Sequence, residues 1–216
     1  MTRSRMTGAE RRLLILESAR RVFSKHGYEA ARTQEIARGS GVSEALLYRH
    51  FPSKQALYRA VLRQTIREQN ASYDVLGIEE LNGRGLVRNL RAYFGFAVSD
   101  APDPIKEGFR LLVASVAGDG SFASLVYRRA NRMMAHRVSA ALEAARADGD
   151  VVGVALSQRN TSMFIEHVGT MLNTIAMNPA RLPYEGDADR VAREAVWFCC
   201  RGLGFTDEAI ARHCTD

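Results

Sequence analysis

The side chains best suited to binding a polyanion lie between Thr33 and Phe51. The pattern predicts two short helices here, over residues 34–39 and from Ser43 to about His50, separated by the tight turn Gly39–Gly41. Each helix is preceded by a hydroxyl residue that can cap it. The second helix directs small or hydrogen-bonding side chains outward, namely Ser43, Glu44, Ala45, Tyr48 and Arg49. A slim helix of this kind fits a DNA major groove about 12 Å wide, with its positive N-terminal end toward the phosphates.

Two such short helices need flanking helices to cover their apolar side. The spacing predicts one from about Gly8 to Lys25, ended by Gly27, and a long one that Ser53 caps. Charge supports a division at the same place. Residues 1–67 hold 14 Lys or Arg and 5 Asp or Glu, a net +9, whereas residues 68–216 hold 16 and 19, a net −3. We therefore expect a basic domain over 1–67 and a second domain over 68–216.

The rest of the chain also indicates helices, about nine or ten in all, so the fold class is all-α. The last long helices are expected over 155–177 and from Asp187, a capping residue, to Arg201, and Thr206 starts a short final helix. No run of 18 uncharged apolar residues and no secretory leader is present, so we expect no membrane span and a cytoplasmic protein. Three cysteines are too few for a disulfide framework or a structural zinc site.

The order and spacing of about a dozen residues over roughly 10–60 resemble the TetR family of transcriptional repressors. The matching segments are Phe23-Ser24-Lys25-His26-Gly27-Tyr28, Thr33-Gln34-Glu35-Ile36-Ala37, Gly41-Val42-Ser43, Leu47-Tyr48-Arg49-His50-Phe51 and Ser53-Lys54-Gln55-Ala56-Leu57. The resemblance implies an N-terminal three-helix helix-turn-helix domain that binds DNA. It also implies a C-terminal helical domain for dimerisation and regulation.

Carried over by position, the resemblance assigns seven residues to double-stranded DNA, namely Thr33, Ser43, Glu44, Ala45, Tyr48, His50 and Lys54. We add two candidates from their places in the sequence: Arg32, beside the first short helix, and Arg49, on the outward side of the second. Thr33, Tyr48 and Lys54 are expected at phosphates, and the Ser43–Ala45 segment at base edges. The sequence departs from the family pattern at Glu44-Ala45, where Lys or Pro and Gly or Ala are frequent. Glu44 could accept a hydrogen bond from a cytosine amino group, or it could serve only to cap its own helix.

The same resemblance implies a homodimer on a palindromic operator, released by a small and largely apolar effector without any cofactor. The last two long helices would form the dimer interface, through Ser162, Gly169, Asn173, Ala192, Val196 and Cys199. Apolar residues and a few polar anchors would line the effector site, namely Phe94, Phe109, Leu112, Met133, His136, Met163, Phe164, His167 and Met171. Both sets could instead be ordinary core.

Other functions remain open from sequence alone. The chain could be a DNA-binding dimer controlled by a protein partner or by nothing, and activators share the same DNA-binding domain. An all-α enzyme is disfavoured, because the sequence lacks a His-Glu-x-x-His helix, a phosphate-binding glycine loop and a Gly-x-Ser-x-Gly elbow. Cys199-Cys200 could sense oxidants, but two buried structural thiols are the simpler interpretation.

Overall fold

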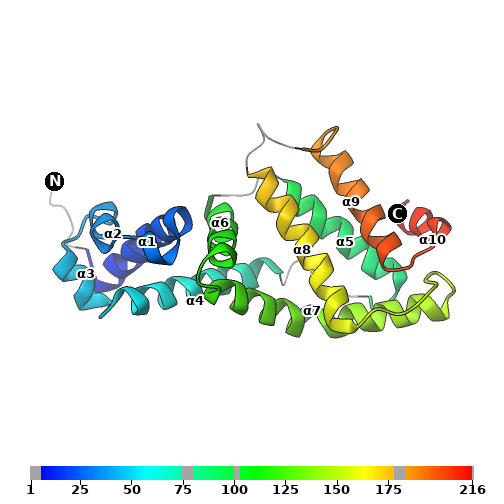
Figure 1. Cartoon of the computed structure of the whole chain (residues 1–216), viewed down its shortest axis with the longest axis horizontal. Coiled ribbons are helices and arrows are strands. Elements are labelled where there is room, and N and C mark those ends of the chain that lie inside the picture. The colour runs from blue at the N-terminus through cyan, green and yellow to red at the C-terminus, as the bar shows by residue number, and fades with distance from the viewer. Residues whose placement is uncertain (1–5, 74–79, 100–102, 178–182, 216) are drawn as a thin grey trace. The chain divides into compact units, whose positions relative to one another are not determined.

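The computed structural model describes residues 6–73, 80–99, 103–177 and 183–215. Within these ranges the chain forms ten α-helices (Figure 1), so the prediction of an all-α fold is confirmed. Their bounds are α1 Gly8–Ala30, α2 Thr33–Gly39, α3 Glu44–His50, α4 Lys54–Tyr73, α5 Gly83–Val98, α6 Asp103–Ala117, α7 Ser121–Ala147, α8 Gln158–Ala176, α9 Ala188–Gly202 and α10 Asp207–Cys214. No single helix among the described residues is long and apolar enough to cross a membrane.

The helices group into two compact units. The first comprises residues 1–71 and 103–124, and the second comprises residues 72–102 and 125–216. Although α6 lies in the middle of the sequence, it belongs to the first unit, where it packs against α1. The division expected at residue 67 stays a prediction about domain organisation.

The first unit is held together by the apolar face of α1. Ile15, Ala19 and Phe23 on this face are fully buried. The ring of Phe23 meets the ring of Tyr58 from α4 edge-on, with 4.8 Å between centroids. Near its end α1 is interrupted at Gly27, whose φ of +71° agrees with the glycine break expected there.

A buried arginine links three helices of the first unit. Arg20 on α1 is 8% exposed. Its Nη1 lies 2.5 Å from Glu68 of α4, and its Nε lies 2.9 Å from Glu107 of α6. Because an unpaired buried guanidinium is strongly destabilising, both carboxylates are needed to retain this charge inside the unit. The pair of bridges therefore fixes α6 to α1 and α4.

The core of the second unit is built around α5. Leu86, Leu90 and Phe94 of α5 are at most 1% exposed. The helices α8, α9 and α10 all pack against α5, and α9 and α10 contribute buried Val196 and Ile210. This packing follows from the alternation of apolar side chains at three- and four-residue intervals along each helix.

A carboxyl group is buried between α5 and α8. Glu166 of α8 is 6% exposed, and burial raises its pKa because the charged form loses its hydration. The hydroxyl of Tyr93 on α5 donates a hydrogen bond to Glu166 Oε2 at 3.1 Å, and the hydroxyl of Thr170 lies 3.5 Å from Oε1. Gly169 leaves space for the tyrosine ring, since a Cβ there would lie 2.3 Å from Tyr93 Cε1.

The final helix is attached by a second buried carboxylate, Asp150, which follows α7. Its Oδ2 lies 2.7 Å from Nε2 of His213, and its Oδ1 accepts a hydrogen bond from Arg212, both on α10. Its backbone carbonyl accepts a hydrogen bond from the amide of Thr206, which caps α10. Burial opposes ionisation of Asp150, but the hydrogen bonds from His213 and Arg212 outweigh it and lower its pKa.

Replacing Asp150 with asparagine is expected to lower the free energy of unfolding by about 2 kcal/mol at pH 7, because two charge-assisted hydrogen bonds are weakened. A lowered folded-state pKa means that this stabilisation is complete above the unfolded-state pKa and is lost as the pH falls through the folded-state value. Urea unfolding of both proteins should therefore show a gap that shrinks below about pH 4. A gap of the same size at pH 7 and pH 3 would contradict this role.

Candidate nucleic-acid interface

The helices α2 and α3 are joined by a tight turn that leaves one side of α3 uncovered. Gly41 in this turn has a φ of +67°. The hydroxyl of Ser43 accepts a hydrogen bond from the amide of Leu46 at 3.2 Å, so Ser43 caps α3 as expected. Ile36 and Leu47 are fully buried and fix the two helices to the rest of the unit. The opposite side of α3 is left for a binding partner.

The structure places all nine predicted DNA-contacting residues in the first unit. Five are exposed, namely Arg32, Ser43, Ala45, Tyr48 and Arg49, and four are half-buried, namely Thr33, Glu44, His50 and Lys54. The exposed residues of α3 leave a small methyl group, a phenol and a guanidinium accessible on one short helix. That combination suits contact with base edges and phosphates.

Three of the nine side chains are already bonded to one another. The hydroxyl of Thr33 donates a hydrogen bond to Glu44 Oε1 at 2.6 Å and lies 3.2 Å from the hydroxyl of Tyr48. Since Thr33 has one hydroxyl proton and directs it to Glu44, Tyr48 is the donor in the second bond. The expectation that Thr33 caps its helix is wrong, because the N-cap of α2 is Arg32, which makes no side-chain cap bond. The hydroxyl of Thr33 is instead occupied by a residue of α3.

Lys54, at the start of α4, is also anchored within the chain. Its ammonium donates a hydrogen bond to the backbone carbonyl of Glu29 at 2.9 Å and lies 4.8 Å from the centre of the Tyr28 ring. An ammonium has three N–H donors, so this position still permits a phosphate contact. The anchoring determines where the charge lies before any ligand arrives.

Arg12 is a basic residue of this region that the motif did not identify. Its Nη1 donates a hydrogen bond to the backbone carbonyl of His50 at 3.2 Å, and its guanidinium lies 4.2 Å from the centre of the Phe51 ring. Arg12 thus ties α1 to the C-terminal end of α3. The sequence offered no signal for this pairing, because the two residues are 38 positions apart.

Residues 15–61 match the family model of bacterial regulatory proteins of the tetR family. The match runs from α1 into α4 and includes the whole of α2 and α3. Over residues 15–61 the chain has the N-terminal domain of the tetR family. The resemblance inferred from the motif residues is confirmed.

Two curated relatives extend the TetR comparison. The chain is 36% identical over 110 residues to the transcriptional activator FasR of Mycolicibacterium smegmatis, covering 50% of this chain and 48% of that relative. It is 32% identical over 79 residues to the transcriptional repressor AcnR of Corynebacterium efficiens, covering 37% and 42%. The chain thus spans less than half the length of either relative that it matches. One of these two relatives is an activator and the other is a repressor.

A solved structure supports the fold over most of the length. A TetR-like transcriptional regulator from Rhodococcus sp. RHA1 matches with a TM-score of 0.67 and 20% identity, covering 92% of this chain and 98% of that one. At this identity the likeness concerns the arrangement of helices alone. It agrees with the match to the tetR family over residues 15–61.

The structure does not bring the nine predicted effector residues into one unit. Phe109 and Leu112 are buried in the first unit, because they lie on α6. The other seven lie in the second unit: Phe94 is buried, Met133 and Met163 are half-buried, and His136, Phe164, His167 and Met171 are exposed. The effector site therefore stays a proposal, and that proposal is limited to residues of the second unit.

The six residues predicted at the dimer interface are packed inside the second unit. Ser162, Gly169, Asn173, Ala192, Val196 and Cys199 are all buried within the chain. Their place at a dimer interface stays a prediction. The small side chains at these positions serve internal packing, as Gly169 does for Tyr93.

The cysteines of the second unit have the character of structural thiols. Burial raises the pKa of Cys199 to about 11 and raises that of Cys200 further. Both remain protonated near neutral pH and are therefore poor nucleophiles. Over the described ranges, no group of three or more histidine, cysteine, aspartate or glutamate side chains could hold a metal ion.

Proposed function

We propose that this chain is a TetR-family transcriptional regulator that binds a palindromic DNA operator as a homodimer and is released by a small, largely apolar effector, most simply as a repressor. The observation that carries the proposal is the outer side of α3, where Ala45, Tyr48 and Arg49 are exposed on a helix capped by Ser43. A dimer would place two such helices about 34 Å apart, in successive major grooves on one face of DNA.

Selection of bound DNA from a random pool tests this proposal. The full chain should enrich a palindrome whose half-sites lie about 10 base pairs apart, or a multiple of that spacing. Recovery of no preferred sequence, with equal affinity for all duplexes, would overturn it. The same selection returns the operator and its half-site spacing together.

The role of Glu44 is a separate test of whether the start of α3 contacts base edges. Its carboxylate accepts the hydrogen bond from Thr33, so one oxygen is already used within the protein, and the other can still meet a cytosine amino group. Repeating the selection with Glu44→Gln should return an altered operator if the carboxylate reads a base. An unchanged operator would limit Glu44 to positioning Thr33 and Tyr48.

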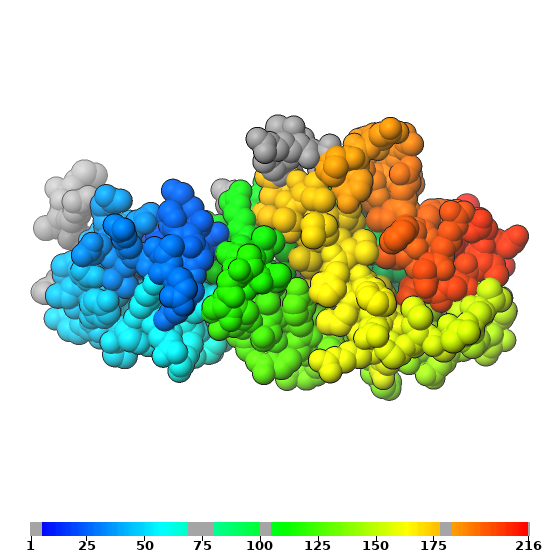
Figure 2. Space-filling view, in the orientation of Figure 1, coloured from blue at the N-terminus to red at the C-terminus, as the bar shows by residue number. Residues whose placement is uncertain are grey.

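The dimer interface is proposed on the outer sides of α8 and α9. In the space-filling view α8, in yellow, is not covered on the face turned to the viewer (Figure 2). Phe164 and Met171 of α8 are 57% and 55% exposed, and Phe198 of α9 is 71% exposed. Large apolar side chains with this exposure are typical of interface anchors. They lie on the same two helices as the residues first predicted, but on the uncovered side.

Replacing Phe198 with aspartate is expected to weaken dimerisation at least about 100-fold, because an aromatic side chain that the proposed interface would bury is replaced by a charge that must lose its water. Sedimentation velocity over a range of protein concentrations measures the change. Val154→Asp is the control, since Val154 is 93% exposed and lies outside α8 and α9. A Phe198→Asp protein that stays dimeric at the same concentrations as the control would place the interface elsewhere.

The effector is proposed to bind in the second unit among Phe94, Met133 and Met163. These three are the apolar members of the predicted set that belong to this unit and are buried or half-buried. Adaptable methionine and phenylalanine side chains suit an apolar ligand. A thermal-shift screen with apolar compounds tests this site, because a ligand that binds only the folded protein raises its melting temperature. Control by a protein partner predicts no hit in such a screen.

A further inference from the structure

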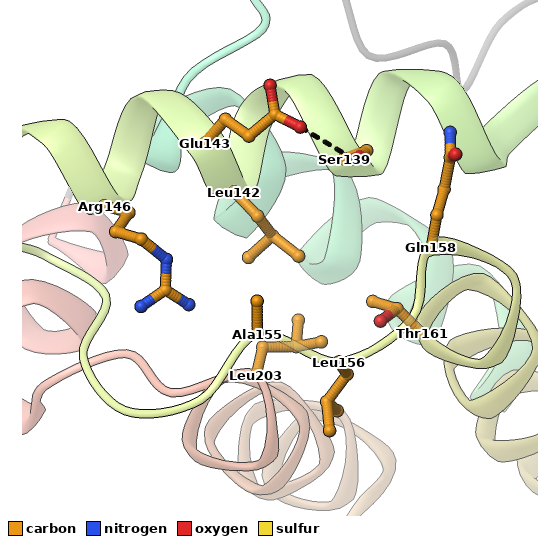
Figure 3. Close-up of a pocket in the computed structure, with 9 residues that line it drawn as sticks. All are labelled: Ser139, Leu142, Glu143, Arg146, Ala155, Leu156, Gln158, Thr161 and Leu203. Carbon is orange, nitrogen blue, oxygen red and sulfur yellow. Dashed lines mark hydrogen bonds between the residues drawn. The ribbon is translucent and has the colours of Figure 1, made fainter.

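The second unit contains a cavity that the residues discussed so far do not line. It has a volume of about 170 Å³ and lies between α7, the segment that leads into α8, and Leu203 beyond α9 (Figure 3). Its centre is apolar, formed by Leu142 of α7 with Ala155, Leu156 and Leu203. None of the nine predicted effector residues is among its lining.

One end of this cavity carries a cation. Figure 3 shows the side chain of Arg146 extending from α7 toward the space beside Leu142. Its Nη1 donates a hydrogen bond to the backbone carbonyl of Gly153 at 2.7 Å, which holds the guanidinium in place. A guanidinium has five N–H donors in a planar fork, so it can bind a carboxylate in addition to that carbonyl.

The other charged groups around the cavity leave room for an anion at the Arg146 end. Glu143 also lines the cavity, but its carboxylate accepts a hydrogen bond from the hydroxyl of Ser139 at 3.1 Å and lies along α7, away from Leu142 (Figure 3). Gln158, at the opposite end, is the first residue of α8, whose N-terminus carries partial positive charge. A cation and a helix N-terminus thus flank an apolar centre.

We propose that this cavity binds a small monocarboxylate with a compact apolar body, with the carboxylate on Arg146 and the body against Leu142 and Leu203. Size restricts the class further. An apolar cavity of about 150 Å³ holds a benzene molecule. A ligand of the size of benzoate or isovalerate therefore fits, whereas a long acyl chain does not. This binding is separate from the proposed regulation of transcription, because it requires no DNA and no second chain.

Isothermal titration calorimetry of the full chain with sodium benzoate tests the proposal. The expected Kd is on the order of 1 mM or tighter for a ligand of about nine heavy atoms. Benzamide, which has the same shape without the charge, should bind at least about 10-fold more weakly, because the charge-assisted bonds to Arg146 are lost. Absence of benzoate binding at 20-fold above the expected Kd, about 20 mM, would overturn the proposal.

Two variants and a control identify the site. Arg146→Gln should weaken benzoate binding at least about 10-fold, while Arg132→Gln, which removes an exposed arginine from the same helix, should leave it within about twofold. Ala155→Phe keeps Arg146 and fills the cavity, so it should abolish binding without relying on the arginine. Equal affinities in Arg146→Gln and Arg132→Gln, or unchanged binding in Ala155→Phe, would show that benzoate binds elsewhere. A melting temperature measured without ligand verifies that each variant is folded.

Discussion

Replacing Gly169 with alanine is expected to lower the free energy of unfolding by about 3 to 5 kcal/mol. The added methyl group would lie 2.3 Å from Cε1 and 2.6 Å from the hydroxyl oxygen of Tyr93, far inside van der Waals contact. The tyrosine ring must therefore move, and its hydroxyl then loses the 3.1 Å hydrogen bond to Glu166. Glu166 then keeps the longer contact to Thr170, so only part of its desolvation cost adds to the cost of overpacking.

Urea unfolding monitored by circular dichroism at pH 7 measures this change. Gly95→Ala is a matched control, because Gly95 lies in α5, the helix that carries Tyr93, and a Cβ there would meet no atom within 4 Å. The control should be neutral or stabilising by up to about 1 kcal/mol, since alanine favours a helix interior. The prediction fails if Gly169→Ala changes the free energy of unfolding by less than about 1 kcal/mol, which is no more than the control. That result would show that Tyr93 and Glu166 rearrange at little cost.

Replacing Arg49 with glutamine is expected to lower the affinity of the proposed dimer for its operator at least about 30-fold, since each half-site loses a contact of about 1 kcal/mol or more. Arg49 is exposed in the last turn of α3, on the side that the proposed groove contact uses. If it meets a phosphate, the loss is similar for all DNA sequences. The slope of log affinity against log salt then falls by about two for a dimer, one for each lost phosphate contact.

Fluorescence anisotropy at several salt concentrations measures both quantities. Arg193→Gln is the control, because Arg193 is an exposed arginine of α9 and its loss changes the net charge by the same amount. The control should leave affinity and slope nearly unchanged. Equal losses in both variants would mean that net charge, and not the surface of α3, determines DNA affinity.

Local features of this fold could be predicted from sequence because they depend on neighbouring residues. Ser43, Asp187 and Thr206 cap α3, α9 and α10 as expected, since a cap bond reaches only to a residue three positions away. The predicted start of α8 at 155 was wrong, because the helix begins at Gln158 after the Ser157 cap. The apolar residues before Ser157 follow the helical period without being part of the helix.

Features that depend on distant residues could not be predicted. The hydroxyl of Thr33 bonds to Glu44, 11 positions away, in place of its own helix, and no local pattern encodes that choice. The small residues of α8 suit close packing with a second chain and with the ring of Tyr93 equally well. The predicted DNA-contacting residues were easier to place together because they lie on one contiguous motif. The effector residues came from helices of both units, which only the tertiary fold separates.

The late position of α6 in the sequence has a consequence for synthesis of the chain, because α6 packs in the first unit. Its carboxylate Glu107 completes the pairing of the buried Arg20, yet about thirty residues of the second unit, 72–102, lie between α4 and α6 in sequence. On the ribosome, α1 to α4 therefore emerge with a buried arginine that lacks one of its two carboxylates. We therefore expect the first unit to reach its final packing only after residue 124 has left the exit tunnel, because residues 103–124 are part of it. A nascent chain paused before that point should be more sensitive to protease at α1 than one paused after it.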